Sequence, residues 1–213
     1  MFKIGLTQRV EVLPNRGERR DCLDQAWTRL LAENGLVPVP LPNRVDDVDI
    51  LFDRIGLDGI ILTGGNDPAH LPGATNTAPE RDAFERRLLQ GCAARNIPVL
   101  GVCRGMQMLV DFHGGTITAI DNHRGRPHGI VVQSASDAML IDREAVNSFH
   151  TYGVQASGIP DDLRILALAP DGTVEAVAHR RLRQWAVMWH PERSPHDPRD
   201  ARLIRDLFGG PRS

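Results

Sequence analysis

Residues 97–115 have the sequence IPVLGVCRGMQMLVDFHGG, and this stretch decides the fold. Its first six residues predict a short buried strand, and residues 104–115 predict a helix that ends at a glycine pair. Strand passes to helix through the G-x-C-x-G of residues 101–105, where small residues permit a turn too tight for larger ones. We therefore expect a strand–turn–helix unit with Cys103 at its apex.

Strand and helix signals alternate before this unit. We expect strands at 2–7, 36–41 and 58–65, and helices at 19–34, 46–56 and 80–95. The prolines of 36–41 favour a sheet edge or a loop for that segment. Alternation of this kind predicts an α/β fold with a mostly parallel central sheet and helices on both faces.

The pattern changes after Gly115. Short strands are predicted at 129–133, 163–168, 174–179 and 184–190, and a closing helix at 198–208. Turns such as Pro170-Asp171-Gly172 separate them, which favours added antiparallel strands in the C-terminal half. With no internal repeat or linker, and 213 residues of which 41% are hydrophobic, we expect a single domain over 1–213.

Composition excludes several classes of partner. The formal net charge of −2 gives no bulk attraction to nucleic acid or to an anionic membrane. Three cysteines do not make a disulfide framework, which favours a reducing compartment. The N-terminal apolar run meets Gln8 and Arg9 too early for a secretory signal, and no stretch approaches the roughly 20 apolar residues of a membrane span. We expect a soluble cytoplasmic protein.

Cys103 is the candidate nucleophile. The G-x-C-x-G turn of residues 101–105 has the pattern of a nucleophile elbow, a tight turn that exposes the central side chain. This elbow would place Cys103 at the carboxyl end of a central strand, where open α/β sheets bind their ligands. It would also begin a helix, whose N-terminal partial charge favours thiolate over thiol. The alternative is a core cysteine beside a helix-packing glycine, and the two flanking glycines argue against it. Cys22 and Cys92, on predicted helices without an elbow, are expected to be core residues.

A cysteine nucleophile needs a base, and the base needs a group that orients it. The candidates are His190 and Glu192 in the segment MWHPER, where Pro191 breaks the strand so that the two side chains can meet. A surface turn or a pair of metal ligands are the alternatives. We expect no metal site, because Cys22 and Cys92 are assigned to helices and no C-x-x-C or H-x-x-x-H spacing is present.

Chain order separates two architectures that use such a nucleophile. An α/β-hydrolase has its histidine last, whereas here the order is Cys103, His190, Glu192. This order, with GVCRGMQ and WHPE, resembles the class I glutamine amidotransferases. The resemblance continues in LTGGND (62–67), VNSFHTYG (146–153) and PDGTVEAV (170–177). It implies a flavodoxin-like fold and a Cys–His–Glu triad.

Within that superfamily, VNSFH and PDGTVEAV resemble the free-standing γ-glutamyl hydrolases of the peptidase C26 type. The opening GLTQRVEVLPNRGERRDCLDQAW, the MWHPER segment and the short chain are more similar to hydrolases acting on γ-glutamyl-CDP-amidate in the phosphoramidate modification of bacterial capsules. The resemblance implies release of glutamate from a small-molecule γ-glutamyl amide through a thioester, without a cofactor. It leaves open γ-glutamyl-γ-aminobutyrate hydrolysis in polyamine breakdown, a glutaminase subunit feeding a partner synthase, and a homodimer.

The same resemblance implies further site residues. Backbone N–H groups of Gly65 and Arg104 would form an oxyanion hole. The γ-glutamyl group would be bound by Asn66, Gln107, Ser148 and His150. For Gln107 the alternative is ordinary helix surface, and for His150 it is a satisfied buried histidine.

The loop DNHRGRPHG (121–129) follows the elbow helix closely in sequence. If it overhangs the site, Arg124 and Arg126 could pair with phosphate oxygens of a nucleotide leaving group, because guanidinium geometry matches phosphate. A solvated surface loop is the alternative. This feature favours a nucleotide amidate over an aminobutyrate amide.

Overall fold

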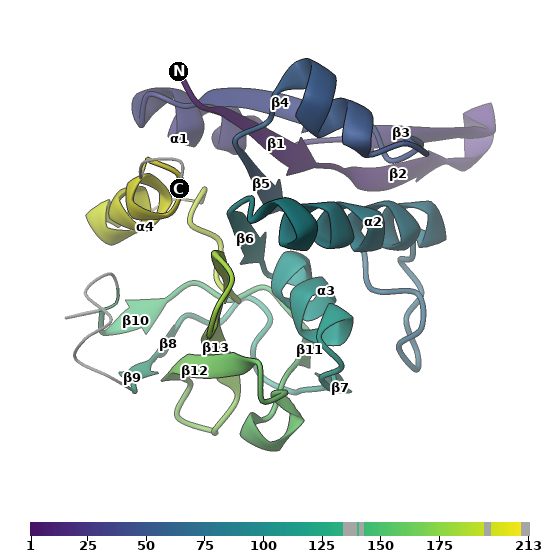
Figure 1. The fold of residues 1–213 in the computed structure, drawn as a ribbon. Helices are drawn as coiled ribbons and strands as arrows, with labels where there is room; N and C mark the ends of the chain where they lie inside the picture. Colours follow the sequence, from purple (N-terminus) through teal and green to yellow (C-terminus); the bar gives the residue numbers. More distant parts are fainter. Residues whose placement is uncertain (134–139, 141–142, 194–196, 210–213) are drawn as a thin grey trace.

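The computed structural model describes residues 1–133, 140, 143–193 and 197–209 (Figure 1). An eight-stranded sheet forms its centre, with the strands in the order β4-β1-β5-β6-β14-β13-β12-β9. Their bounds are β4 Val37–Leu41, β1 Lys3–Thr7, β5 Gly59–Leu62, β6 Val99–Val102, β14 Gln184–Val187, β13 Val174–His179, β12 Leu163–Leu168 and β9 Val131–Val132. The first five strands are parallel, and β13, β12 and β9 are added antiparallel.

Helices cover both faces of this sheet. On one face lie α1 (Gln25–Glu33) and α4 (Pro198–Phe208), and on the other α2 (Pro79–Arg95) and α3 (Arg104–Phe112) (Figure 1). Trp27 of α1 packs in the same core cluster as Phe208 of α4, whereas Phe84 of α2 and Leu109 of α3 belong to the opposite cluster. The α/β prediction, with a mostly parallel sheet and antiparallel strands in the C-terminal half, is confirmed.

Two of the predicted helices are wrong in part. Residues Glu18–Cys22 form β3, which pairs with β2 (Arg9–Leu13) in a hairpin projecting from the sheet (Figure 1). The helix begins only after Asp24, whose carboxylate accepts a hydrogen bond from the Ala26 N–H at 3.0 Å. Cys22 is therefore a hairpin residue. Of the helix predicted at 46–56, the structure has a single π-helical turn at Leu51–Ile55.

The connection between α3 and β12 contains two small antiparallel sheets of two short strands each. β7 (Thr118–Ala119) pairs with β11 (Tyr152–Gly153), and β8 (His128–Gly129) pairs with β10 (Ala145–Val146). The strand predicted at 129–133 is consequently split, because the Ile130 N–H bonds to Glu144 rather than continuing one ladder.

The predicted edge position of the proline-containing strand is confirmed, since β4 ends the sheet.

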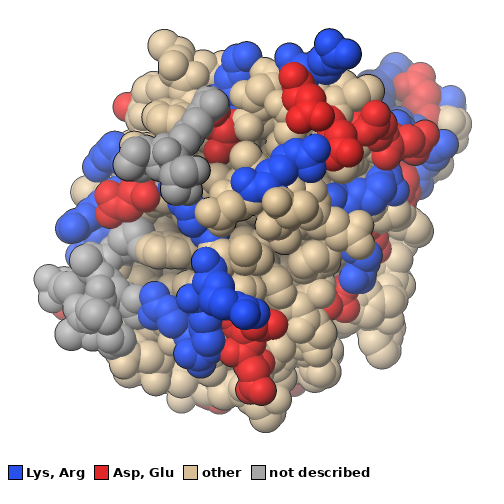
Figure 2. Space-filling model, in the orientation of Figure 1, with Lys and Arg blue, Asp and Glu red and all other residues tan. Residues whose placement is uncertain are grey.

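On the face seen in Figure 2, acidic and basic side chains are interspersed, so no large patch of a single charge sign forms there. This agrees with the small net charge of −2. Among the described residues, no helix is both long enough and apolar enough to cross a bilayer.

Candidate active site

Cys103 lies in the turn between β6 and α3 with φ +52° and ψ −107°, a strained conformation for a residue with a side chain. The turn depends on its glycines. A Cβ on Gly105 would stand 2.0 Å from the Leu62 carbonyl oxygen, and a Cβ on Gly101 would stand 2.6 Å from the Gly105 oxygen. Close packing of helix on strand therefore permits only glycine at both positions, and it presents the Cys103 side chain to a cavity.

His190 and Glu192 follow β14, the parallel neighbour of β6. Nδ1 of His190 lies 2.7 Å from Oε1 of Glu192, and both side chains are buried. Gly64 sits against this pair: a Cβ there would be 2.7 Å from His190 Cε1 and 3.5 Å from Cys103 Cβ. The three predicted triad residues are thus brought together, with Nε2 of His190 left to face the cysteine.

The electrostatics suit an ion pair between cysteine and histidine. Burial lowers the pKa of His190, but hydrogen bonds to Cys103 and Glu192 outweigh it and raise that pKa to about 9. His190 is therefore an imidazolium at neutral pH. An imidazolium next to a sulfur atom favours the thiolate, which is the nucleophilic form of cysteine.

The loop after β5 is held by a buried guanidinium. The guanidinium of Arg81, fully buried, donates to the carbonyl oxygens of Thr63 at 2.6 Å and Gly64 at 3.1 Å, and also to that of Gly65. In a trans peptide the carbonyl and the following N–H point in opposite directions. Holding the Gly64 carbonyl therefore turns the Gly65 N–H away from Arg81.

A second N–H group comes from Arg104. As the first residue of α3, it has no intrahelical acceptor for its backbone N–H. Gly65, Cys103 and Arg104 all line one cavity. The predicted oxyanion-hole residues thus lie beside the predicted nucleophile.

The side chain of Arg104 points elsewhere, into a buried ionic network on α2. It pairs with Glu85 and Asp82, and Glu85 also accepts from Arg81 at 2.8 Å. Arg81 was missed by the sequence analysis. The signal was present, because Arg81 and Glu85 occupy the same helical face as the apolar Leu88.

The cavity has a volume of about 540 Å³, within the range of small-molecule sites. Four arginines line it, together with the acidic residue Asp67: Arg104, whose side chain pairs with α2, and Arg9, Arg124 and Arg193. A second space of about 510 Å³ extends from it along the β2 hairpin and shares Arg9 and Gly65 with it. The site is therefore elongated and predominantly cationic.

Four of the predicted substrate-binding residues line this cavity: Asn66, Gln107, Arg124 and His150. Gln107 donates to the Tyr152 carbonyl oxygen at 2.9 Å, which fixes the orientation of its amide. The amide of Asn66 is engaged with the backbone of Val10, at 2.8 and 3.0 Å.

Ser148 and Arg126 are not among the residues that line the cavity. Ser148 is buried, and its carbonyl oxygen accepts from the Gly125 N–H at 2.8 Å. The Arg126 guanidinium bonds to Asn122 at 3.1 Å. Of the two loop arginines, the structure therefore brings only Arg124 to the site.

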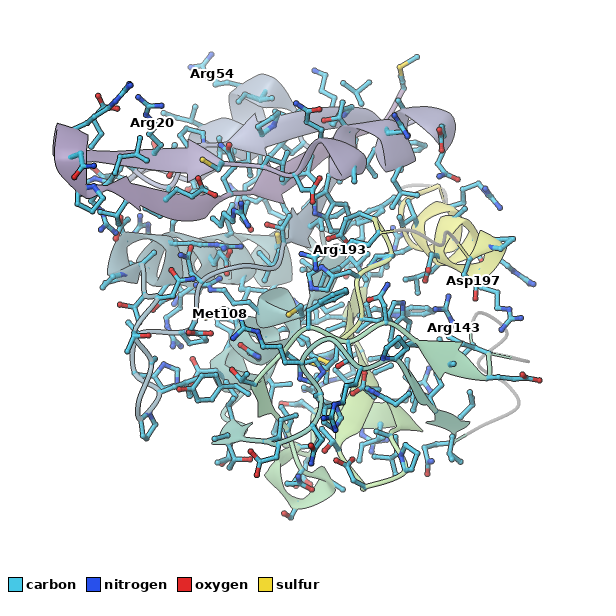
Figure 3. The ribbon with its side chains drawn as sticks, turned by 180° about the vertical axis from the view of Figure 1, so that it is seen from behind. Arg20, Arg54, Met108, Arg143, Arg193 and Asp197 are labelled. Atoms are coloured by element: carbon cyan, nitrogen blue, oxygen red, sulfur yellow. The ribbon has the colours of Figure 1, made fainter. Side chains whose placement is uncertain are left out.

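Phe149 and Arg193 were also missed. The Phe149 ring meets the His190 ring edge-on at 5.6 Å, and the Arg193 guanidinium stacks 4.5 Å above Phe149. Figure 3 shows Arg193 in the middle of the molecule, with Arg143 and Asp197 beside one another near α4. Phe149 is 44% exposed, so it covers the histidine while remaining open to a bound ligand.

A buried cysteine–histidine–glutamate set beside two available N–H groups suits acyl transfer through a thioester. Two groups of histidine and acidic side chains among the described residues lie close enough to hold a metal ion, and neither includes Cys103 or His190. A mostly parallel sheet with this set at the carboxyl ends of its strands defines a class I glutamine amidotransferase-like protein.

Comparison with known proteins gives the family. A model described as Peptidase C26 matches residues 4–192, and the chain belongs to that family. It is 31% identical over 209 residues to γ-glutamyl-CDP-amidate hydrolase of Campylobacter jejuni, with 96% of each chain covered. It is 28% identical over 225 residues to γ-glutamyl-γ-aminobutyrate hydrolase of Escherichia coli O157:H7, covering 92% of this chain and 87% of the relative.

Solved structures agree on the architecture. A glutamine amidotransferase of Thermotoga maritima superimposes with a TM-score of 0.66, covering 98% of this chain and 82% of that one. At 15% sequence identity, this likeness concerns the fold.

Proposed function

We propose that this protein hydrolyses a γ-glutamyl amide bond, with Cys103 as the nucleophile and glutamate as one product. The observation that carries the proposal is the meeting of Cys103 and His190 in one cavity, with Glu192 Oε1 2.7 Å from His190 Nδ1 to orient the imidazole. Membership of the Peptidase C26 family supports the same reaction class.

In the proposed mechanism, the Cys103 thiolate attacks the γ-carbonyl carbon, and the carbonyl oxygen becomes an oxyanion. Backbone N–H groups of Gly65 and Arg104 bind that oxyanion, each donor contributing roughly 3 kcal/mol to transition-state stabilisation. His190 then gives its Nε2 proton to the leaving nitrogen, and the C–N bond breaks to leave a γ-glutamyl thioester.

Hydrolysis of the thioester uses the same base. His190, now neutral, takes a proton from water as the hydroxide adds to the thioester carbonyl. Collapse of the second tetrahedral intermediate releases glutamate and restores the thiolate–imidazolium pair. Glu192 accepts the hydrogen bond from Nδ1 throughout.

We further propose γ-glutamyl-CDP-amidate as the substrate. Besides Arg104, the arginines Arg9, Arg124 and Arg193 line the cavity, and the adjoining space of about 510 Å³ offers room for a large leaving group. A nucleotide diphosphate supplies anionic oxygens that guanidinium groups pair with, whereas γ-aminobutyrate carries one carboxylate. The 31% identity to a γ-glutamyl-CDP-amidate hydrolase over 96% of both chains points the same way.

The test compares three amides at equal concentration: γ-glutamyl-CDP-amidate, γ-glutamyl-γ-aminobutyrate and glutamine. Released glutamate is quantified, and Cys103→Ala serves as the blank. We expect kcat/KM for the nucleotide amidate to exceed the others by at least ~10²-fold, a gap of about 2.7 kcal/mol. Preference for the aminobutyrate amide would overturn the substrate while keeping the reaction.

A pair of variants tests the role of the cationic wall. Arg124→Ala should raise KM for the nucleotide amidate at least ~10-fold, the loss of one charge-assisted contact, and spare a simple γ-glutamyl anilide. Arg126→Ala, in the same loop but not lining the cavity, is the matched control and should change neither KM. Equal effects of the two variants would contradict the proposed phosphate contact.

A further inference from the structure

Three histidines and one glutamate meet at the cavity wall, apart from the triad. His123 comes from the loop leading into β8, His128 is the first residue of β8, His150 precedes β11, and Glu175 lies in β13. The side chains of His150 and Glu175 are 1% and 0% exposed, and that of His123 is 5% exposed. Such burial of a charged group requires partners, since water cannot solvate it.

Each histidine already uses one ring nitrogen on an oxygen atom. His123 Nε2 lies 2.8 Å from an Asp171 carboxylate oxygen, and His150 Nδ1 lies 3.2 Å from the Tyr152 carbonyl oxygen. His128 Nδ1 lies 3.3 Å from the carbonyl oxygen of Arg126. Carbonyl and carboxylate oxygens only accept, so each of these outer nitrogens carries the proton.

The second nitrogen of every ring faces Glu175. Oε1 of that carboxylate lies 3.5 Å from His123 Nδ1, 3.2 Å from His128 Nε2 and 3.6 Å from His150 Nε2. These separations are at or beyond the upper end of N–H···O hydrogen bonds, and none of the three nitrogens has a hydrogen-bond partner in the described part of the chain.

This arrangement leaves the three nitrogens and both Glu175 oxygens without a hydrogen-bond partner among the described residues. In the neutral tautomer, each inner nitrogen turns a lone pair toward the carboxylate. Three imidazolium rings would instead repel one another, with neighbouring ring centroids only 4.6 and 4.9 Å apart. A cation held between the nitrogens and the carboxylate satisfies all of them at once, because every group around it is then a lone-pair donor.

The distances match one geometry. With metal–ligand bonds of about 2.0–2.1 Å, a tetrahedral zinc site has its ligand atoms about 3.3–3.4 Å apart. The separations of the three nitrogens from Glu175 bracket this value. The donor atoms of His123, His150 and Glu175 all lie within 4.8 Å of one another, in a group that does not include His128. Imidazole nitrogens favour zinc and related transition metals over magnesium or calcium.

The surroundings of the cluster also suit a metal. A histidine that binds a metal through one nitrogen usually donates the other N–H to a carboxylate or a backbone carbonyl. Asp171, Tyr152 and Arg126 supply those oxygens here.

We propose that His123, His150 and Glu175 form a binding site for Zn²⁺ or a similar divalent transition metal, with His128 Nε2 beside it at 3.2 Å from the Glu175 carboxylate. Because the three ligands come from three separate segments, the metal has a structural role. It ties the loop that carries Arg124 to β13 and to the segment before β11. The proposal departs from the expectation of no metal site, and its ligands come from segments far apart in the sequence.

A second group of similarly close side chains provides the control. His113, Asp162 and His179 also lie within 4.8 Å of one another. However, His179 Nδ1 accepts from the N–H groups of Arg181 at 3.0 Å and Leu182 at 2.9 Å, which places its proton on Nε2. That nitrogen cannot bind a metal, so His179→Asn should not change metal binding.

The experiment uses the full chain without a histidine tag, in a Cys103→Ser background so that the nucleophile cannot hold metal. After removal of metal with a chelator, Zn²⁺ or Co²⁺ is added, and bound metal is counted by mass spectrometry after desalting. We expect one equivalent per chain and the visible absorption of tetrahedral Co²⁺. Zinc at a hundredfold excess over its Kd should raise Tm by about 5–10 °C.

Variants assign the ligands. Glu175→Gln keeps the shape of the side chain and should lose the Co²⁺ spectrum, while Asp171→Asn should weaken metal binding about 10–100-fold by freeing the His123 ring. His179→Asn should behave as the parent. Absence of stoichiometric metal, or equal binding by the parent, Glu175→Gln and His179→Asn, would overturn the proposal.

Discussion

Asn147 holds the backbone of His190 through both ends of its amide. Oδ1 accepts from the His190 N–H at 2.8 Å, and Nδ2 donates to the His190 carbonyl oxygen at 2.9 Å. The segment before β11 is thereby fastened to the segment after β14. Asn147 therefore fixes the position of the imidazole through the His190 backbone. The ring itself remains available to Cys103 and Glu192.

Replacing Asn147 by Ala should lower kcat about 10–100-fold, because a small displacement of a catalytic group is costly, while changing KM much less. Steady-state kinetics on the preferred γ-glutamyl amide measures both constants. Asn122→Ala is the control, since the Asn122 side chain bonds to Arg126, which does not line the cavity. Equal kinetics for the two variants would show that the His190 backbone needs no such support.

The raised pKa of His190 predicts a basic limb in the pH profile. The imidazolium donates a proton to the leaving nitrogen, so kcat/KM should fall as the pH rises through about 9. Glu192→Gln removes the carboxylate at 2.7 Å and should move this limb to lower pH, with kcat reduced about 10²–10⁴-fold. A limb unchanged by the substitution would assign it to another group.

The same shift affects stability. A folded-state pKa of about 9, raised above the ordinary value of 6.5, means that the folded protein binds this proton more tightly than the unfolded chain. The resulting stabilisation is complete below pH 6.5 and is lost as the pH rises through about 9. Urea unfolding across this range measures it, and Glu192→Gln should flatten the dependence.

Gly64→Ala should damage activity more than stability. The added methyl group would lie 2.7 Å from His190 Cε1, so the imidazole must shift. We expect kcat to fall at least ~10²-fold from this misplacement, with a loss of about 1–3 kcal/mol in the free energy of unfolding. Activity within about twofold of the parent would show that the ring has room to move.

Arg81→Met should destabilise the protein by at least about 3 kcal/mol, because Glu85 loses a buried partner and three carbonyl groups lose their donor. Arg81→Lys should cost less, yet still lower kcat, since a single ammonium cannot span the loop as the guanidinium does. Urea unfolding and kinetics together separate the two effects.

Arg86→Met is the matched control on the same helix. Its guanidinium is half exposed and pairs with Asp111, an interaction worth only about 0–1 kcal/mol. If Arg81→Met were no more destabilising than this variant, the buried network would contribute little.

Much of the site was predictable because its signals are local. The two glycines around Cys103 are required because the backbone of the adjacent turn and strand leaves no room for a Cβ. Five consecutive residues are therefore enough to predict the elbow. His190 and Glu192 stand two residues apart, and a proline between them lets both face one way. The helix predicted at 19–34 was wrong at its start because the charged segment Glu18–Cys22 pairs with β2, a partner that helical periodicity does not reveal.

By itself the sequence determined the α/β class and the order of Cys103, His190 and Glu192 along the chain, since each depends on neighbouring residues or on regular spacing. The tertiary structure decided which distant side chains meet. Asn147 reaches His190 across 43 residues, and Glu175 faces His123 across 52. Such contacts depend on the strand order that brings β14 beside β6 and β13 beside β14, and no local pattern encodes them.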